Sequence, residues 1–580
     1  MIHAIPEYIP FTWRSTPVFL FILRDLFVFV IAIAGLALPA WHWLGWARGV
    51  ERLALALAAA LLIGYLVIFG LYLAGLSLRW FWVLPAAGLV HALFRPAGIA
   101  GWRGDPVARR LLGRWLLLAL WCLGWQGLVV SYSGGGWAGD WVEHYERAHF
   151  FLQHWPADSL FLGLYPVPSR PPLVNLWTAG LLSQTDGGFA HHQVFTTLLG
   201  SLVIFPLTVM LRRWRTDRHA ETLLLILLML SPLFVQNATF PWTKLASAFF
   251  VLMAITQLIP GTGEPIRERL IAGAVLLAGG MLAHYSAGPW ICAFVVAGAW
   301  SRRHQWRERY FQQSLLLAIL LSGLLFASWL GWALAVYGPA TTFTANTAVG
   351  LAPGGALAER VARAAGNLWY TVTPIVAHPD GTLLQQTSRL GQWRDHAFML
   401  LQLKLPFAFG SVGGAVILWL LLRLKWSEQT RYWLITVPLV VGLGTAAHSQ
   451  ADRYGLAHIS LQPLVLLGLV WLAAEADRLP RWLGRIWAAG LAIDFSLGIL
   501  LHFAVQSLWL DRWLRPGLGA AQYLADYTMT ARNNWADKST LHLTFLADIV
   551  SPATCWTLLL VAGLTAGAFY WRACTVPNSD

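Results

Sequence analysis

The stretch YSGGGWAGDWVEHYERAHFFLQHWPADSLFLGLYPVPSRPPL, residues 132–173, is the polar segment around which the rest of this chain is organised. Hydrophobic runs lie on both sides of it, and one of them (111–131) has the roughly 20 apolar residues that cross a bilayer as a helix. Its charged and imidazole side chains include Asp140, Glu143, His144, Glu146, Arg147, His149, Asp158 and Arg170. Polar groups at this density between membrane spans indicate an outer loop where chemistry is to be sought.

The composition of the chain places it in the membrane. Its 580 residues are 57% hydrophobic and only 12% charged, whereas soluble proteins carry about 25% charged residues. Apolar runs of roughly 20 residues recur from end to end. We therefore expect an all-α, polytopic membrane protein with about 14–15 transmembrane helices. The short apolar run 79–95 either crosses the membrane or re-enters it.

The net charge of +13 has its explanation in membrane topology. Most Lys and Arg residues fall in short clusters between spans, such as 101–114, 212–219 and 302–309. Clusters of this kind mark cytoplasmic connections by the positive-inside rule. From Arg103 onward each cluster falls on the same side, so we expect no nucleic-acid partner and a multi-pass protein of the plasma (inner) membrane.

The same alternation divides the chain into regions. We expect an extra N-terminal transmembrane segment (1–110), a core (111–337), an outer loop (338–397) and a C-terminal transmembrane region (398–580) with an outer segment at 511–553. The polar clusters within NATFPWTK (237–244), HYSAG (284–288) and HSQADRYG (448–455) all fall on the outer side, with the stretch 132–173. This shared side predicts one site facing outward, toward a periplasm or cell exterior.

Asp140 is the candidate catalytic residue. If residues 140–153 form a helix, Asp140, Glu143, His144 and Arg147 share one face by their three-and-four spacing. The bland interpretation is that Asp140 caps the helix and the rest is a solvated face. The functional one is a general base at the membrane surface, reached over a glycine-rich run that lets a ligand approach closely.

Glu143, His144 and His284 are candidate ligands of a divalent cation, which accepts mixed oxygen and imidazole donors. A single Glu-His pair is also common without a metal. A lone His at the end of a span is often only a satisfied interfacial residue, and His284 has as a further alternative a hydrogen bond to a sugar phosphate.

Three cations are candidates for a donor phosphate. Lys244 stands on the outer side against the positive-inside bias, although a lysine at the start of a span also snorkels. Arg170 has a guanidinium fork that matches phosphate oxygens. Arg453 either pairs with Asp452 or clamps the donor phosphate. The aromatic residues Trp141, Tyr285 and Tyr454 are candidates for contacts with the substrate.

At these residues the chain resembles the GT-C superfamily of integral-membrane glycosyltransferases, and in particular its protein O-mannosyltransferase and aminoarabinose-transferase group. The resemblance rests on GDWVEH (139–144), RPPL (170–173), PWTKL (241–245) and HYSA (284–287), and it covers about residues 111–337. It implies inverting transfer of a sugar from a polyprenyl-phosphate carrier, with Asp140 activating the acceptor. It also implies, for some members, a cation near the donor phosphate, here on Glu143, His144 and His284.

The chain departs from that family pattern in the second outer loop. Many members carry a second acidic residue there, whereas NATFPWTK (237–244) has neither Asp nor Glu. The departure weakens a two-carboxylate metal site and shifts the donor-phosphate role toward Lys244 and Arg170.

The expected function is therefore transfer of a sugar from a polyprenyl-phosphate-linked donor, within membrane lipid, to a hydroxyl of a glycan, lipid or protein. No cytoplasmic connection is long enough for a Rossmann unit that would bind a nucleotide sugar. One rival is an O-antigen polymerase or ligase-like enzyme that relies on the 338–397 loop. Another is a lipid or sugar transporter, which would place charges at mid-membrane.

Overall fold

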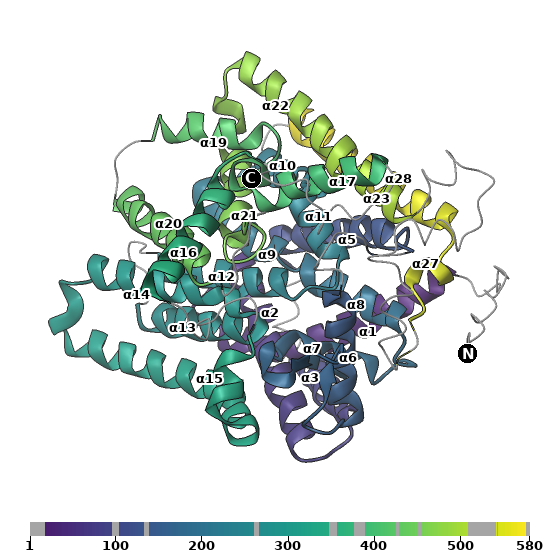
Figure 1. The fold of residues 1–580 in the computed structure, drawn as a ribbon, viewed down its shortest axis with the longest axis vertical. Helices are drawn as coiled ribbons and strands as arrows, with labels where there is room; N and C mark the ends of the chain where they lie inside the picture. The colour runs from purple at the N-terminus through teal and green to yellow at the C-terminus, as the bar shows by residue number, and fades with distance from the viewer. Residues whose placement is uncertain are drawn as a thin grey trace.

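The computed structural model describes residues 18–95, 104–130, 132, 139–259, 266–346, 356–375, 389–424, 428–448, 455–507, 541 and 543–575. Most of these residues are helical (Figure 1). Within them the only sheet is a hairpin of two short antiparallel strands, β1 (Leu160–Phe161) and β2 (Tyr165–Pro166). The all-α class expected from the sequence is confirmed.

The helices before residue 260 form the N-terminal part of the bundle and the candidate site. They are α1 (Val18–Trp43), α2 (Gly49–Leu73), η1 (Leu78–Trp82), α3 (Val83–Phe94), α5 (Pro106–Gln126), α6 (Asp140–Gln153), η3 (Val167–Ser169), α7 (Leu173–Leu182), α8 (Phe189–Ser201), α9 (Ile204–Trp214), α10 (Arg218–Leu230), α11 (Pro232–Thr239) and α12 (Lys244–Leu258). Helices α8 and α12 are buried over almost their whole length, and the polar side chains of α8 are buried with the apolar ones. They form the centre against which the other helices pack.

The remaining helices surround that centre. They are α13 (Ile266–Ala283), η4 (Tyr285–Ala287), α14 (Gly288–Ser301), η5 (Gln305–Arg307), α15 (Arg309–Thr344), α16 (Leu357–Val372), α17 (Arg389–Phe398), η6 (Met399–Leu403), α18 (Leu405–Ala408), α19 (Gly413–Leu421), α20 (Glu428–Ala446), α21 (Gln462–Glu475), η7 (Ala476–Arg478), α22 (Arg481–Ile493), η8 (Asp494–Leu500), α23 (Leu501–Gln506), α27 (Leu546–Ile549) and α28 (Pro552–Thr575). Helices α15 and α28 carry many exposed apolar side chains and lie at the periphery (Figure 1).

Within the described residues, six continuous helices are long and apolar enough to cross a membrane, and a seventh span is added if a bent pair counts as one. This number is lower than the roughly fifteen apolar segments expected from hydropathy. The difference arises because several segments are broken or short. Pro232 begins a new helix after Ser231, so that α10 and α11 meet at 64°. The run 79–95 forms only η1 and the 12-residue α3.

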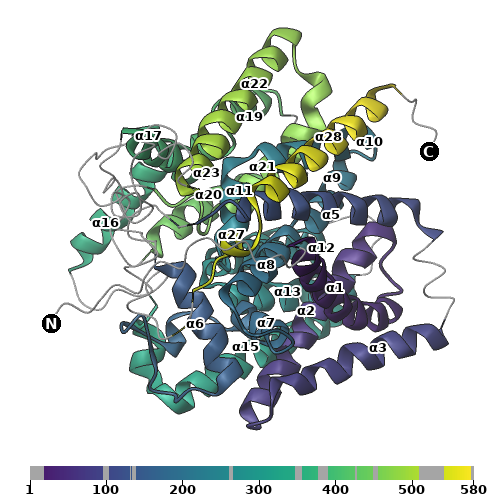
Figure 2. The ribbon, with the colours of Figure 1, turned by 90° about the vertical axis from the view of Figure 1, so that its right-hand side faces the viewer.

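The basic connections lie together at one end of the bundle, as the charge pattern predicts. Glu221 of α10 forms ion pairs with both Arg114 and Arg212. Glu51, at the start of α2, similarly pairs with arginines of two other connections, Arg213 at 3.3 Å and Arg269 at 3.0 Å. Figure 2 shows α6, α16 and α17 toward one side of the molecule and the end of α28 toward the other.

The region 338–397, expected to be a long loop, contains helical structure. Helix α15 continues to Thr344 across a kink at Gly338, whose φ of 72° suits glycine and which precedes Pro339. Helix α16 and all but the last residue of α17 also fall in this region, while residues 347–355 and 376–388 lie outside the described part. Residues 511–540 of the outer segment 511–553 also lie outside it.

Candidate active site

Helix α6 begins at Asp140, so the helix expected from the sequence is confirmed. Gly139 is the N-cap residue, and no side chain caps the helix. The Asp140 carboxylate instead contacts the segment just before α12. Its Oδ2 accepts a 3.0 Å hydrogen bond from the indole N–H of Trp242. Because Asp140 faces other chain segments and not its own helix end, the capping interpretation does not describe it.

Glu143 lies one turn further along α6 and is fully buried between two arginines. Its Oε1 accepts a 2.9 Å hydrogen bond from Nε of Arg147, and its Oε2 lies 3.4 Å from Nη2 of Arg170. The same Arg170 nitrogen lies 3.6 Å from Oδ1 of Asp140. Arg170 therefore bridges the two carboxylates and orients both.

Arg147 fixes the segment that carries Arg170. Its guanidinium donates to the backbone carbonyl of Val167 over 2.7 Å and to the hydroxyl of Ser169 over 2.6 Å, and it stacks on the ring of Phe161. These contacts hold η3 and β1 against α6, so a rigid support places Arg170 next to Glu143.

Lys244 is the first residue of α12 and is buried. Its Nζ lies 3.6 Å from the centre of the Trp242 ring, a cation–π contact. The ring of His458 packs against the same indole, with ring centres 5.6 Å apart. Since Trp242 also bonds to Asp140, one indole links the carboxylate and the ammonium.

The acidic groups of α6 differ in protonation behaviour. Burial raises the pKa of Asp140, and the opposing charges of Arg170 and Lys244 offset only part of that rise. Burial also acts to raise the pKa of Glu143, but Arg170 and Arg147 outweigh it and lower that pKa to about 2. Glu143 is thus a locked anion, whereas Asp140 is the more basic carboxylate.

The predicted metal ligands do not form a fitting donor set. Both Glu143 oxygens face guanidinium groups, and Nδ1 of His144 lies 3.1 Å from the side-chain oxygen of Asn175. Nδ1 of His284 accepts a hydrogen bond from the backbone N–H of Ser286. Among the described residues no three His, Cys, Asp or Glu side chains are grouped so as to hold a metal ion. The positive charges of Arg147 and Arg170 beside Glu143 would also repel a metal cation.

The predicted substrate-binding aromatics have other surroundings. Trp141 is fully buried and packs against the rings of Tyr132, Phe189 and Phe545, so the structure gives it a packing role in place of the predicted contact. The hydroxyl of Tyr285 donates to the carbonyl of Pro168 over 3.3 Å and accepts from the indole of Trp329. Tyr285 therefore supports the η3 segment. Arg453 and Tyr454 lie outside the described residues.

Two residues of the site escaped the sequence analysis. Trp242 stands directly before the Thr243–Lys244 pair, and the signal that could have identified it was a tryptophan beside a lysine expected on the outer side. Tyr165, in β2, is partly exposed. Burial raises its pKa most, and the nearby negative charges of Glu143 and Asp140 raise it further. Hydropathy did not predict the β1–β2 hairpin that brings Tyr165 to the site.

A comparison with protein-family models finds no match, and a comparison with curated proteins finds none. Among solved structures, this chain is similar to ArnT from Cupriavidus metallidurans bound to undecaprenyl phosphate, at 14% identity and a TM-score of 0.44, over 79% of this chain and 75% of that one. The apo state of that protein is similar at 15% identity and a TM-score of 0.41, with the same coverage.

ArnT is an aminoarabinose transferase of the GT-C superfamily, the group that the motifs at Asp140 and Lys244 resemble. A likeness at these TM-scores carries no functional conclusion. The side-chain contacts of α6, η3 and α12 therefore bear the weight of a functional assignment.

Proposed function

We propose that this chain is an inverting glycosyltransferase that moves a sugar from a polyprenyl-phosphate carrier to an acceptor hydroxyl at the outer face of the plasma membrane. The observation that carries the proposal is one partly exposed carboxylate of raised pKa, Asp140, beside the cations Arg170 and Lys244. A general base next to a phosphate-binding pair is the set of groups that such a transfer requires.

The two carboxylates of α6 have separate roles because their environments move their pKa values apart. Glu143 stays ionised between Arg147 and Arg170, so it is a weak base and acts by positioning Arg170. Asp140 has about a fifth of its side chain exposed, 22%, and is accessible to an acceptor. Asp140 is therefore the residue that accepts a proton.

The reaction is a single displacement. The acceptor hydroxyl transfers its proton to Asp140 as its oxygen forms a bond to the anomeric carbon, on the face opposite the phosphate. The bond between that carbon and the phosphate oxygen breaks, and polyprenyl phosphate leaves with the electron pair. Lys244 and Arg170 stabilise the charge that develops on the phosphate. The proton on Asp140 then passes to water.

The location of the site suits a lipid-borne donor. Lys244 is the first residue of α12, and Arg269 of a basic connection donates to the carbonyl of Thr256 near the other end of that helix, so the site and this connection lie at opposite ends of α12. A polyprenyl chain held in the bilayer would present its phosphate at this level. The positive charge of Lys244 at the helix N-terminus adds to the helix dipole, which also favours an anion there.

The test uses the purified full-length protein, polyprenyl-phosphate sugars and envelope extract as the source of acceptors, with release of polyprenyl phosphate as the readout. We expect Asp140→Asn to lower the rate by about 100- to 10,000-fold, the usual contribution of a general base, while donor binding persists. Asp158→Asn is the matched control, because Asp158 is an exposed aspartate of the same segment.

Retained transfer in Asp140→Asn would contradict the mechanism. Transfer that survives this change but is lost on alteration of the 338–397 region would favour the polymerase or ligase-like reaction. Movement of the intact lipid-linked sugar across the membrane without cleavage would favour a transporter.

A further inference from the structure

Helix α16 has its apolar side exposed and its polar side against the protein. One side of the helix consists only of apolar residues, all of them exposed: Leu357, Ala358, Val361, Ala362, Ala365, Leu368, Trp369 and Val372. Leu357, Val361 and Trp369 keep 78%, 59% and 57% of their surface exposed. Asn367 and Thr371 fall on the other side and are buried. A surface helix of a water-soluble domain has the reverse order, with its apolar side buried.

Two hydrogen bonds fix the helix in this orientation. The side-chain amide of Asn367 donates to the carbonyl of Thr445 over 3.2 Å, one residue before α20 ends. The hydroxyl of Thr371 accepts the backbone N–H of Leu456 over 3.0 Å. Because both bonds come from the polar side of α16, its apolar side is held facing away from α20.

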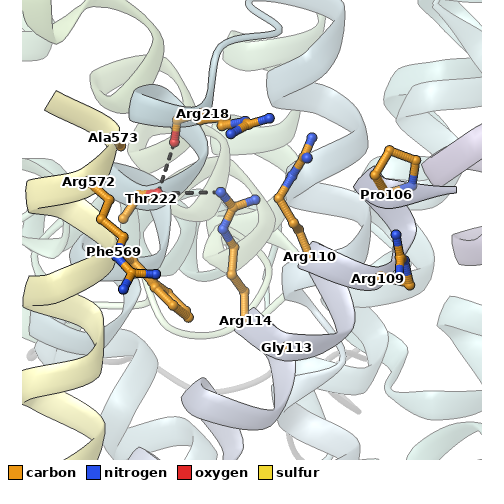
Figure 3. A pocket seen from close by; sticks show the side chains of 10 residues that line it. All are labelled: Pro106, Arg109, Arg110, Gly113, Arg114, Arg218, Thr222, Phe569, Arg572 and Ala573. Atoms are coloured by element: carbon orange, nitrogen blue, oxygen red, sulfur yellow. Dashed lines mark hydrogen bonds between the residues drawn. The ribbon is translucent and has the colours of Figure 1, made fainter. Parts of the chain in front are cut away.

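Helix α5 relates the two ends of the bundle to each other. Its first turns carry Arg110 and Arg114, which help to line the cavity shown in Figure 3. Its last residue, Gln126, donates to the hydroxyl of Tyr132, whose ring packs on Trp141, the residue after the proposed base. The 21 residues of α5 rise by roughly 30 Å, which is the thickness of the hydrocarbon core. The two ends of α5 therefore correspond to the two surfaces of the membrane.

Helix α16 lies at the level of the Asp140 end. Leu456, whose N–H bonds to Thr371, precedes His458 by two residues, and the ring of His458 packs against the indole that bonds to Asp140. Figure 2 shows α16 and α6 toward the same side of the molecule. The 16 residues of α16 rise by roughly 24 Å, less than the hydrocarbon thickness of about 30 Å, so this helix is too short to cross a membrane.

The surroundings of the apolar side indicate lipid as its partner. Leu443, at the same end of α20 as Thr445, is also exposed, so both helices present apolar surface at this level. Trp369 has an apolar ring with one N–H donor, which suits the boundary between acyl chains and headgroups. Arg360 is exposed next to the apolar side, where its guanidinium suits a lipid phosphate. These are the features of helices that lie in a membrane surface.

We infer that α16 lies along the membrane surface on the Asp140 side, with its apolar side among the acyl chains and its polar side on the protein. Such helices are buried about 5–10 Å into the boundary between headgroups and acyl chains. The contacts through Leu456 then set the height of the Asp140 cluster relative to the headgroups. The placement of α16 does not depend on the proposed transfer reaction.

The experiment measures the depth of spin labels on α16 in the purified full-length protein. The exposed Cys292 and Cys574 are first replaced by serine. Single labels at Val361→Cys and Glu359→Cys are then compared in nanodiscs of phosphatidylcholine and phosphatidylglycerol that hold one protein each. Oxygen concentrates in lipid, whereas a nickel chelate stays in water. We expect the ratio of oxygen to nickel-chelate accessibility to be about tenfold higher at Val361→Cys.

Glu359→Cys is the matched control, because Glu359 is equally exposed but lies on the polar side of the same helix. Equal ratios at the two positions would overturn the inference. So would a Val361→Cys label shielded from both reagents, because in a nanodisc with one protein the chain itself would then cover the helix.

A third label, at Leu368→Cys, tests the direction of the helix. Leu368 lies on the apolar side, two turns after Val361. A helix that lies along the surface gives the same depth at both positions, within a few ångströms. A difference of about 10 Å, the rise of two turns, would show that α16 enters the bilayer end-on and would overturn the placement.

Discussion

The indole N–H of Trp242 donates a 3.0 Å hydrogen bond to Oδ2 of Asp140, although 102 residues separate the two in the chain. The same indole ring carries the ammonium of Lys244 on its face. Trp242 therefore fixes the distance between the proposed base and the proposed phosphate-binding cation.

Replacement of Trp242 by Phe keeps the ring face for Lys244 but removes the hydrogen bond to Asp140. That bond lowers the pKa of Asp140, so its loss raises this pKa further. Because a general base acts in its deprotonated form, the acid limb of the activity profile should move to higher pH. Loss of a hydrogen bond to a charged group should also lower kcat by about tenfold or more. The measurement is the pH dependence of kcat for both proteins.

Trp141→Phe provides the control for that experiment. Trp141 is equally a buried tryptophan near Asp140, but its indole nitrogen has no hydrogen-bond partner among the described residues. The pH profile of Trp141→Phe should match that of the unchanged protein. A shift of the same size in both variants would mean that ring packing, and not the hydrogen bond, sets the pKa of Asp140.

Lys244→Met should weaken donor binding, because it removes a buried positive charge at the proposed phosphate position. We expect KM for the polyprenyl-phosphate sugar to rise by about tenfold, the effect of one charge-assisted contact of 1.4 kcal/mol. Lys244→Arg keeps the charge and should retain most of the affinity. An unchanged KM in Lys244→Met would reduce Lys244 to an interfacial lysine that packs on Trp242.

The broad architecture was predictable because it depends on composition and spacing. Apolar runs gave an all-helical membrane protein, and the three-and-four spacing from Asp140 to Arg147 gave α6 with its polar face. The number of continuous spans was not predictable from hydropathy alone. A run of apolar residues is equally hydrophobic when Pro232 bends it by 64° into two short helices.

The sequence predicted which residues form the site better than it predicted what each of them does. The motifs that we expect on the outer side do bring Asp140, Arg170, Lys244 and His284 close together. The sequence could not show that Arg147 and Arg170 occupy both oxygens of Glu143, because such pairing depends on how η3 folds back on α6. For this reason the sequence analysis interpreted Glu143 and His144 as metal ligands, whereas in the structure Glu143 forms ion pairs with Arg147 and Arg170.

Arg147→Leu should destabilise the protein strongly, because it leaves the buried Glu143 with one partner. Breaking a buried ion pair from one side costs about 3–5 kcal/mol. Arg478→Leu is the contrasting change, since Arg478 and Glu475 form an exposed pair whose loss should leave Tm almost unaltered. Thermal unfolding of the purified variants measures both. Similar Tm values for Arg147→Leu and the unchanged protein would show that Arg147 does not support the site.

The same ion pair should give a characteristic pH dependence. The pKa of Glu143 is lowered to about 2 in the folded protein, against about 4.3 in an unfolded chain. Its ionised form therefore contributes stability above pH ~4.3, and this contribution is lost as the pH falls toward about 2. The difference in Tm between the unchanged protein and Glu143→Gln should be constant from neutral pH to about pH 5 and should narrow below it. A difference that widens on acidification would contradict the assignment of Glu143 as a locked anion.

The membrane orientation can be tested with single cysteines at the two ends of the bundle. Asp158 and Trp306 are both exposed, on the segment after α6 and on the basic connection between α14 and α15. The exposed Cys292 and Cys574 are first replaced by serine. A membrane-impermeant maleimide added to intact cells should label Asp158→Cys, whereas Trp306→Cys should react only after permeabilisation. The positive-inside rule requires this result, because the arginines around Trp306 stay on the cytoplasmic side. Labelling of Trp306→Cys in intact cells would place the Asp140 site inside the cell and exclude transfer at the outer face.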